Sequence, residues 1–320
     1  MRDAGCRDLN SRAHPASRDP HPVTRIPYLA SRNPHHQERP TPMDIRRMTS
    51  DDLPLGLRLS AQAGWNQTET DWRRFLWLEP EGCFVVESAA EPVATTAAFV
   101  FGAVGWIAML LVDEAFRHRG IATQLVQQAL QYLDGRGVQT VRLDATPLGR
   151  PVYERLGFLP EYRLLRMQGE VSLPSDDRRY APLPAERVPG VCELDAAITG
   201  TSRKKLIQRL HAERPEAVTA AFDGRTAVGY AFWRPGRRAG QIGPAAAVSA
   251  ATGVAMLDRV LARCPAGPLF IDVPADNRAA VQWAETHGFV VQREFTRMVR
   301  GPRIADFPQR IWASSGPEKG

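Results

Sequence analysis

The segment at 115–126, AFRHRGIATQLV, places arginines beside small residues where a helix is expected to begin. Arg117, Gly120 and Ala122 have the spacing Arg-x-x-Gly-x-Ala and follow a strongly apolar stretch. The first turn of a helix has backbone N–H groups without internal partners, and its dipole favours anions. Small residues let a phosphate approach that backbone closely. The spacing therefore predicts a phosphate-binding turn made of Arg117, His118, Arg119, Gly120, Ile121, Ala122 and Thr123.

A second motif, Tyr153-Glu154-Arg155-Leu156-Gly157-Phe158, begins 30 residues after Thr123, the last residue of that turn. With the first, it resembles the Gcn5-related N-acetyltransferase (GNAT) superfamily, whose coenzyme A pyrophosphate loop has the pattern Gln/Arg-x-x-Gly-x-Gly/Ala. In that superfamily the corresponding tyrosine often protonates the departing thiolate. The resemblance covers about residues 43–170 in the order of elements, and it implies acetyl-CoA as the donor. No metal is expected, because the four cysteines are far apart and form no CxxC pair.

A narrower likeness is carried by Gly64-Trp65-Asn66-Gln67-Thr68 and by Arg142-Leu143-Asp144-Ala145-Thr146-Pro147. These segments resemble GNAT proteins that have a C-terminal YitH/HolE-type domain. The second half of the chain fits that likeness at Gly229-Tyr230, Arg234-Pro235-Gly236 and Ile242-Gly243-Pro244. The resemblance fixes no particular substrate.

The resemblance also implies roles for residues around the reacting atoms. The strand that ends at Leu110, Leu111 and Val112 should diverge from its neighbour and offer N–H groups to the thioester carbonyl, where they would stabilise negative charge. Tyr153 should be the general acid. Asp144, at the end of a strand, is the preferred candidate for a general base, with Asp71 and Glu87 as alternatives. Deprotonation of the amine through water would need none of them.

The acceptor pocket has candidates in the first half of the chain. Trp65, Asn66, Asp71 and Trp72 combine polar groups with aromatic walls, which suits an orienting contact. The alternative interpretation is a helix cap with core tryptophans.

The elements that must position these residues favour an α/β fold with a mixed, mostly antiparallel central sheet. Shifting the first half by 131 places Gly157-Phe158 on Gly288-Phe289, which indicates a divergent internal duplication. In the second copy Arg117, Gly120 and Tyr153 are replaced, so we expect tandem GNAT-like domains with a degenerate second member. The expected domains are a disordered tail at 1–42, a catalytic domain at 43–170, a linker at 171–190, a degenerate YitH/HolE-like domain at 191–302 and a C-terminal tail at 303–320.

Composition limits the classes of partner. The formal charge of +6 is divided between the proline-rich segment 1–42 and the remainder, without a basic stripe, so nucleic acid is not favoured. No apolar run has the length that a membrane span requires. Neither a secretory signal nor a transit peptide is expected, and Met43 is an alternative translation start. The four cysteines are far apart and are interpreted as reduced thiols of a cytoplasmic protein.

The chain is therefore expected to be a cytoplasmic acyltransferase that moves an acetyl group from acetyl-CoA to the amine of a small molecule. Acetylation of a protein N-terminus or lysine is the alternative among enzymes. A non-catalytic acetyl-CoA-binding regulator is the alternative outside them, and Tyr153 argues against it, because a sensor has no use for an acid beside sulfur.

Overall fold

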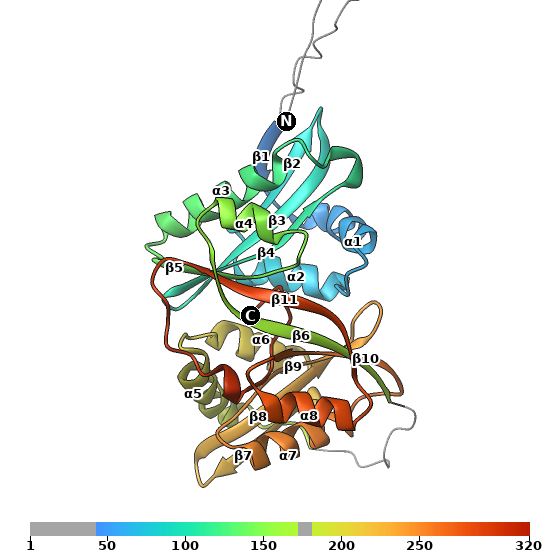
Figure 1. Cartoon of the computed structure of the whole chain (residues 1–320), viewed down its shortest axis with the longest axis vertical. Coiled ribbons are helices and arrows are strands. Elements are labelled where there is room, and N and C mark those ends of the chain that lie inside the picture. The colour runs from blue at the N-terminus through green and yellow to red at the C-terminus, as the bar shows by residue number, and fades with distance from the viewer. Residues whose placement is uncertain (1–42, 172–180) are drawn as a thin grey trace, which may run out of the picture. The chain divides into compact units, whose positions relative to one another are not determined.

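The computed structural model describes residues 43–171 and 181–320 (Figure 1). The expected tail at 1–42 lies outside these residues, as do residues 172–180 of the expected linker. The described part has a mixed α/β fold in which one large, mostly antiparallel sheet carries helices on both faces. The fold class expected from the sequence is confirmed.

The first half alternates strands and helices in the expected order, and local capping fixes where its early helices begin. Thr49 and Asp52 form a capping box just before α1, and Thr68 and Asp71 form another before α2. In each box a threonine side chain and an acidic side chain satisfy N–H groups of the first turn. The elements are β1 (Met43–Arg47), α1 (Leu53–Gln62), α2 (Glu69–Leu78), β2 (Cys83–Ser88), β3 (Glu91–Phe101), β4 (Val104–Val112), α3 (Ile121–Gly135), β5 (Thr140–Ala145), α4 (Arg150–Arg155) and β6 (Leu159–Val171).

After the linker, the described residues of the second half repeat this order from its first helix onward, without a counterpart of β1. Its first helix begins at Val188, three residues before the expected start of the domain. The elements are α5 (Val188–Thr199), α6 (Lys204–Glu213), β7 (Val218–Asp223), β8 (Thr226–Arg234), β9 (Gly240–Ala247), α7 (Ala250–Leu261), β10 (Gly267–Pro274), α8 (Arg278–Thr286), β11 (Val290–Arg300) and β12 (Ile311–Ala313).

The two halves exchange strands within the sheet, whose order is β1-β2-β3-β4-β5-β11-β6-β10-β9-β8-β7. The last long strand of the second half, β11, pairs with both β5 and β6, and β6 pairs in turn with β10. Each half therefore completes the sheet of the other. Segments 43–170 and 191–302, the two expected domains, thus share one sheet.

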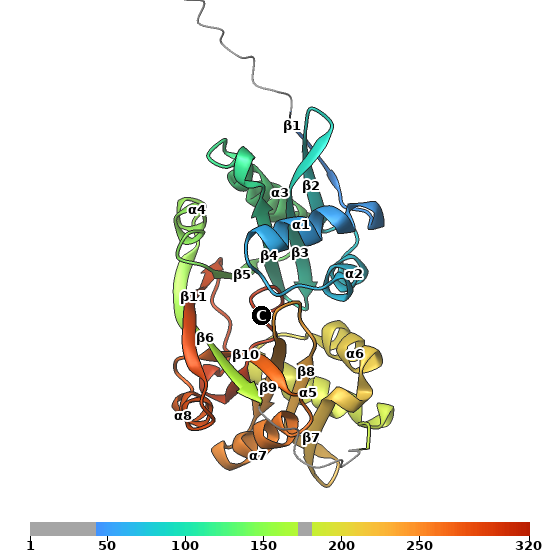
Figure 2. The same ribbon diagram turned by 90° about the vertical axis from the view of Figure 1, so that its right-hand side faces the viewer.

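The helices lie in two layers (Figure 2). Helices α1 and α2 of the first half and α5 and α6 of the second pack on one apolar core, which includes Trp72, Phe75, Ile198 and Leu206. On the other face, α3 and α4 share a core in the first half, and α7 and α8 share another in the second. On one face of the sheet the two halves thus share a single apolar core, whereas on the other face each half has a core of its own.

The segment 303–320, expected as a tail, is folded into the interior. Strand β12 pairs with β9, and the C-terminal end lies between the two halves in both views (Figures 1 and 2). Trp312 is 2% exposed and Lys319 is fully buried. This burial was not foreseen because the segment has only a short apolar run, and it becomes internal by filling a gap that non-local strands create.

Candidate active site

Strand β4 leaves its neighbour β5 and bends a few residues further on. The parallel pairing runs from Val104↔Thr140 to Trp106↔Arg142, although β4 continues to Val112. Further along β4, a register shift against β3 coincides with Met109 in the left-handed region, at φ +53°. A bulge of this kind bends a strand and re-aims its side chains.

The bulge is held from the β3 side. The Thr95 hydroxyl donates to the Met109 carbonyl at 2.9 Å, and the Thr96 hydroxyl donates to the Ala108 carbonyl at 3.2 Å. Both threonines are buried, so these carbonyls have partners inside the protein. The divergence expected near Leu110, Leu111 and Val112 is thus present as a bent strand whose β5-facing edge is released.

The N-terminus of α3 is open. Gly120 caps the helix in the left-handed region at φ +81°, and no side chain makes a cap hydrogen bond there. A Cβ at Gly120 would meet nothing within 4 Å. The first hydrogen bond into the helix runs from Gln124 N–H to the Gly120 carbonyl at 3.2 Å. The N–H groups of Ile121, Ala122 and Thr123 therefore lie in a first turn with no internal partner, and they fit an anion.

The arginines of the turn fold onto their own loop. Arg117 Nε donates to the Val112 carbonyl at 3.2 Å, and Arg119 Nη2 donates to the Ala115 carbonyl at 3.2 Å. The Arg119 guanidinium lies 5.1 Å from the ring centre of Phe116. These contacts shape the turn and keep positive charge beside it, while exposed His118 bends the chain at φ +64°.

Tyr153 lies on α4, buried against Phe158 in an edge-on contact of 5.9 Å. Gly149 and Pro151 begin this short helix, and proline at the first turn is favoured because its missing N–H is not needed there. Burial raises the pKa of the Tyr153 hydroxyl well above its ordinary value. The hydroxyl is therefore protonated at neutral pH, as a proton donor must be.

Tyr153 and the bent part of β4 line one cavity, which we call the central cavity. The lining comes from both halves of the chain: Trp65 and Gln67 before α2, Ile107 to Leu110 on β4, Asp144 and Thr146 near the end of β5, Tyr153, Arg166 on β6, Arg293 and Phe295 on β11, and Pro317 and Glu318 of the C-terminal segment. The structure thus brings together Tyr153, Asp144, Leu110 and Trp65, four of the residues predicted from sequence.

Asp144 is not a free carboxylate. Arg297 of β11 grips both of its oxygens, with Nε–Oδ1 and Nη2–Oδ2 distances of 2.8 Å each. Burial raises the pKa of Asp144, and the Arg297 guanidinium opposes that rise. Both oxygens are occupied, so the geometry favours a positioning pair between β5 and β11 over the general base that the sequence suggested.

Asn66 binds backbone of the second half. Its Nδ2 donates to the Ala239 carbonyl at 2.9 Å, and its Oδ1 accepts the N–H groups of Arg238 and Ala239 at 2.8 and 3.1 Å. This buried amide holds the loop before β9 through both its oxygen and its nitrogen. The predicted contact with substrate is replaced by a contact between the halves.

Asp71 and Trp72 also have structural partners. Asp71 caps α2 and pairs with Arg74 at 2.5 Å. Although burial opposes it, the charges of Lys319, Arg234 and Arg74 hold the pKa of Asp71 well below its usual range. The Trp72 indole is 1% exposed and donates to the Ser60 hydroxyl at 3.2 Å. Of the four acceptor candidates, only Trp65 lines the central cavity.

Several lining residues were missed by sequence reasoning. Gln67 stands beside the predicted Trp65 and Asn66, and that proximity was the available signal. Arg166, Arg293 and Glu318 reach the cavity through strand exchange and the buried C-terminal segment. A local pattern in the sequence has no means of revealing such an approach.

Glu318 belongs to a buried ion network. Its Oε1 accepts from Arg234 Nη2 at 2.6 Å and also contacts Lys319 Nζ. Burial, together with the nearby Arg234, lowers the pKa of Lys319 to about 8. The network closes one side of the central cavity with charges that are paired among themselves.

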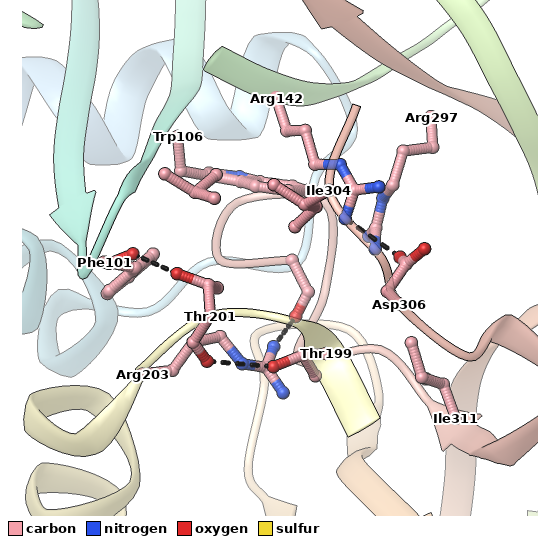
Figure 3. Close-up of a pocket in the computed structure, with 12 residues that line it drawn as sticks. Phe101, Trp106, Arg142, Thr199, Thr201, Arg203, Arg297, Ile304, Asp306 and Ile311 are labelled. Atoms are coloured by element: carbon pink, nitrogen blue, oxygen red, sulfur yellow. Dashed lines mark hydrogen bonds and ion pairs between the residues drawn. The ribbon is translucent and has the colours of Figure 1, made fainter. Parts of the chain in front are cut away.

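A second cavity lies beside the crossing of the halves and is lined by Arg142, Arg203 and Arg297 (Figure 3). Arg142 Nη1 contacts Asp306 at 2.9 Å, Arg203 Nη2 contacts Asp195 at 2.5 Å, and Arg297 is held by Asp144 as described above. Each arginine already has a carboxylate partner. This cavity therefore offers no unmatched charge to a ligand.

The matching place in the second half is closed. Strands β9 and β10 pair from Gly240↔Leu269 to Ile242↔Ile271, and β12 then pairs with β9 at Ala245 and Ala246. The Ser314 N–H donates to the Asp272 carbonyl of β10 at 2.8 Å, so the segment spans the gap. The gap that is open beside β4 is filled by the chain itself beside β9.

The helix N-terminus of the second half is capped. Ser249 Oγ accepts the Thr252 N–H at 3.2 Å at the start of α7. The helix cap thus falls on Ser249, two residues before the position that the 131-residue shift assigns to Gly120. The first turn of α7 has a partner that the first turn of α3 lacks.

The described ranges contain no membrane-spanning helix and no cluster of metal-binding side chains. Within residues 43–171 and 181–320, every helix is too short or too polar to traverse a bilayer. In the same ranges, no group of three or more His, Cys, Asp or Glu side chains gathers as metal ligands would. Cys83, Cys192 and Cys264 are buried free thiols, and burial raises the pKa of each.

Comparison with known proteins gives two family matches, one for each half. Residues 46–158 match the acetyltransferase (GNAT) family, and residues 191–313 match an acetyltransferase (GNAT) domain. The uncharacterized N-acetyltransferase YitH of Bacillus subtilis (strain 168) is 25% identical over 224 residues, which cover 69% of this chain and 78% of that protein.

A second relative and a solved structure extend the comparison. The N-alpha-acetyltransferase MAK3 of Arabidopsis thaliana is 33% identical over 100 residues, which cover 29% of this chain and 53% of that protein. A crystal structure of an acetyltransferase from Pyrococcus horikoshii superimposes with a TM-score of 0.74 at 22% identity, covering 89% of this chain and 99% of the other. That likeness shows the fold.

Proposed function

The chain belongs to the GNAT superfamily of acyltransferases and has two such domains in tandem, and from this premise we propose an N-acetyltransferase that acts on the amine of a small molecule. The observation that supports the proposal best is that Tyr153 and four consecutive residues of the bent strand β4 line one cavity. Acyl transfer needs a proton donor for the leaving group and main-chain N–H groups for the carbonyl oxygen beside the same space.

The residues present in the first half fit acetyl-CoA. The first turn of α3, from Gly120 to Thr123, would hold the diphosphate, because its N–H groups lack partners and a Cβ at Gly120 would meet open space. Main-chain N–H groups near Met109 and Leu110 would stabilise negative charge on the thioester carbonyl oxygen. Acetyl-CoA supplies the activated acetyl group, and the protein supplies placement and charge.

Tyr153 would donate its hydroxyl proton to the departing thiolate sulfur. The hydroxyl is buried and its pKa is raised by that burial, so it carries the proton when needed. No carboxylate of the central cavity is free to act as a base, because Arg297 holds Asp144 and Arg234 holds Glu318. Water would therefore carry the proton away from the attacking amine.

The walls of the central cavity favour a small acceptor. Trp65 comes from the first half, Phe295 from the exchanged strand β11, and Pro317 from the C-terminal segment. These three elements enclose the space beside Tyr153 from different parts of the chain. An extended peptide requires an open groove, and walls that converge on one space from three parts of the chain favour a compact amine instead.

Acetylation of a protein N-terminus is the second candidate. The likeness to MAK3, named as an N-alpha-acetyltransferase, favours it, although that likeness covers only 29% of this chain. Release of free thiol can be measured with a panel of small amines and with short peptides. Turnover of peptides at a much higher kcat/KM than any small amine would favour this candidate.

The test of the mechanism is Tyr153→Phe. We expect kcat to fall about 100-fold or more, because a positioned acid contributes that much, while affinity for acetyl-CoA changes little. Tyr132→Phe is the matched control, because Tyr132 donates to Glu79 at 2.8 Å and does not line the central cavity. Thiol release measures kcat, and calorimetry measures affinity. An unchanged kcat in Tyr153→Phe would remove this hydroxyl from the mechanism.

A further inference from the structure

We propose that the acceptor is an amine that also carries a carboxylate, as a free amino acid does, and that Arg293 binds the carboxylate while Gln67 accepts a hydrogen bond from the amine. The proposal deepens the proposed function and rests on it. Both side chains line the central cavity with Tyr153. Arg293 lacks a carboxylate partner among the described residues, and Gln67 Oε1 lacks a hydrogen-bond partner.

The other charged residues of the central cavity are paired. Arg166 grips Asp272 through Nε–Oδ1 and Nη2–Oδ2 contacts of 2.7 and 2.8 Å. Asp144 is held by Arg297, and Glu318 by Arg234 and Lys319, as described for the site. These pairs neutralise one another, so they leave neither a surplus cation nor a surplus anion facing an acceptor.

Arg293 is the exception. Its Nε donates to Gln292 Oε1 at 3.2 Å, and its guanidinium lies 5.9 Å from the ring centre of Phe295. Among residues 43–171 and 181–320, no carboxylate lies within ion-pair distance of it. Although the charge of Asp272 opposes them, burial and the like charge of Arg166 lower the pKa of Arg293. An anion bound here would relieve both effects, and a guanidinium binds a carboxylate through two parallel hydrogen bonds.

The backbone directs Arg293 toward the cavity. The register of β11 against β6 shifts between Val291 and Arg293, which marks a bulge in β11. Bulges re-aim side chains and are found next to active sites. Since β11 also adjoins β5, the strand exchange delivers a residue of the second half to the chemistry of the first.

Gln67 supplies the second observation. Its side chain is buried at 5% exposure, and its Oε1 has no hydrogen-bond partner. A buried acceptor without a partner is unfavourable, and native structures rarely leave one unless a ligand or water meets it. An amine N–H satisfies it, and the amide carries no charge that would hold the amine in its protonated form.

The two groups together define a substrate class. A cation and a hydrogen-bond acceptor in one cavity match a molecule with a carboxylate at one position and an amine at another. Polyamines lack the anion, and a peptide N-terminus lacks a carboxylate next to the amine. The Trp65 and Phe295 rings provide apolar wall for a side chain of modest size.

The experiment compares L-amino acids with their own carboxamides in the thiol-release assay on the full-length protein. The members of each pair differ in the charge of one group. We expect kcat/KM to be about tenfold or more higher for the acid in the best pair, as one charge-assisted contact provides. Arg293→Gln should bring this ratio close to one without changing the affinity for acetyl-CoA. Arg293→Lys should keep part of it.

Arg300→Gln is the matched control, because Arg300 is on the same strand but outside the central cavity. Its ratio should equal that of the wild type. Turnover of carboxamides or peptides as fast as of the free acids would overturn the inference and leave the proposed function intact. An acid preference that survives in Arg293→Gln would overturn it as well. Acetyl-CoA binding without turnover of any amine would overturn both proposals.

Discussion

The two halves of the molecule present the same constellation in opposite states. In the first half, β4 parts from β5 beside a cavity, and the first turn of α3 is uncapped. In the second, β12 fills the gap between β9 and β10, and Ser249 caps α7. A single fold thus contains an uncapped helix terminus beside a cavity, which we propose as the donor site, and a closed copy of the same arrangement. The contrast shows that loss of the Arg-x-x-Gly-x-Ala spacing goes with physical closure of the site.

The second half contributes residues to the central cavity, although its own helix terminus is closed. Strand β11 takes a place between β5 and β6, and the segment after β12 reaches the central cavity at Pro317 and Glu318. Under the proposed function, the second half therefore forms walls for the acceptor that the first half binds. Asn66 reinforces this arrangement by bonding to the backbone of the loop before β9.

The largest change in acetyl-CoA affinity is expected from substitutions at the uncapped N-terminus of α3. In Gly120→Glu, a carboxylate replaces the space where the diphosphate would lie, and affinity for acetyl-CoA should fall about 100-fold or more. Gly120→Gln has similar bulk and the same left-handed strain without the charge, so its loss should be smaller. Calorimetric titration with acetyl-CoA measures both.

Ser249→Glu makes the corresponding change in the second half. It removes a cap from α7 but should leave affinity for acetyl-CoA at the wild-type value, because that terminus is already closed. A loss in Ser249→Glu as large as in Gly120→Glu would mean that the second half takes part in binding the donor.

A smaller effect, on stability and not on binding, is expected at Trp312, next to the place where β12 fills the gap beside β9. The Trp312 indole lies on α7, and a Cβ on Gly253 would approach its Cε2 to 1.8 Å. Trp312→Ala should lower the free energy of unfolding by about 3–5 kcal/mol, as removal of a buried aromatic side chain does. Denaturant titration measures it.

The control for that change is Trp77→Ala, because Trp77 is 51% exposed. Its contact with Arg209, at 4.9 Å from the ring centre, should be worth about 1 kcal/mol or less. Equal losses in the two variants would show that the segment around Trp312 does not stabilise the second half. Acetyl-CoA affinity should persist in both.

Much of the fold follows from local sequence. Capping residues such as Thr68 and the period of apolar residues predict where helices and strands begin, and those elements recur in the second half. Strand exchange does not follow, because β6 and β11 have the same alternating pattern whichever neighbour they pair with. Their partners are decided by contacts between residues more than 100 positions apart, such as Arg166 with Asp272.

In the candidate site too, residues in short motifs are predictable from the sequence, whereas residues positioned by distant partners are not. Tyr153 and the open turn at Gly120 belong to short motifs, so their spacing predicts their place. Asp144 is predicted as a base from its place at the end of a strand, and the sequence does not reveal its pairing with Arg297 because that partner lies 153 positions away. Arg293 could not be found at all, because only the exchanged strand brings it to the central cavity.

The most direct test of the account is the stoichiometry of acetyl-CoA binding to the full-length protein by calorimetry. An open site in the first half and a closed one in the second predict one molecule of acetyl-CoA for each chain, with no binding detected in Gly120→Glu. Two molecules for each chain, or one molecule that Gly120→Glu still binds with wild-type affinity, would contradict the assignment of the donor site to the first half.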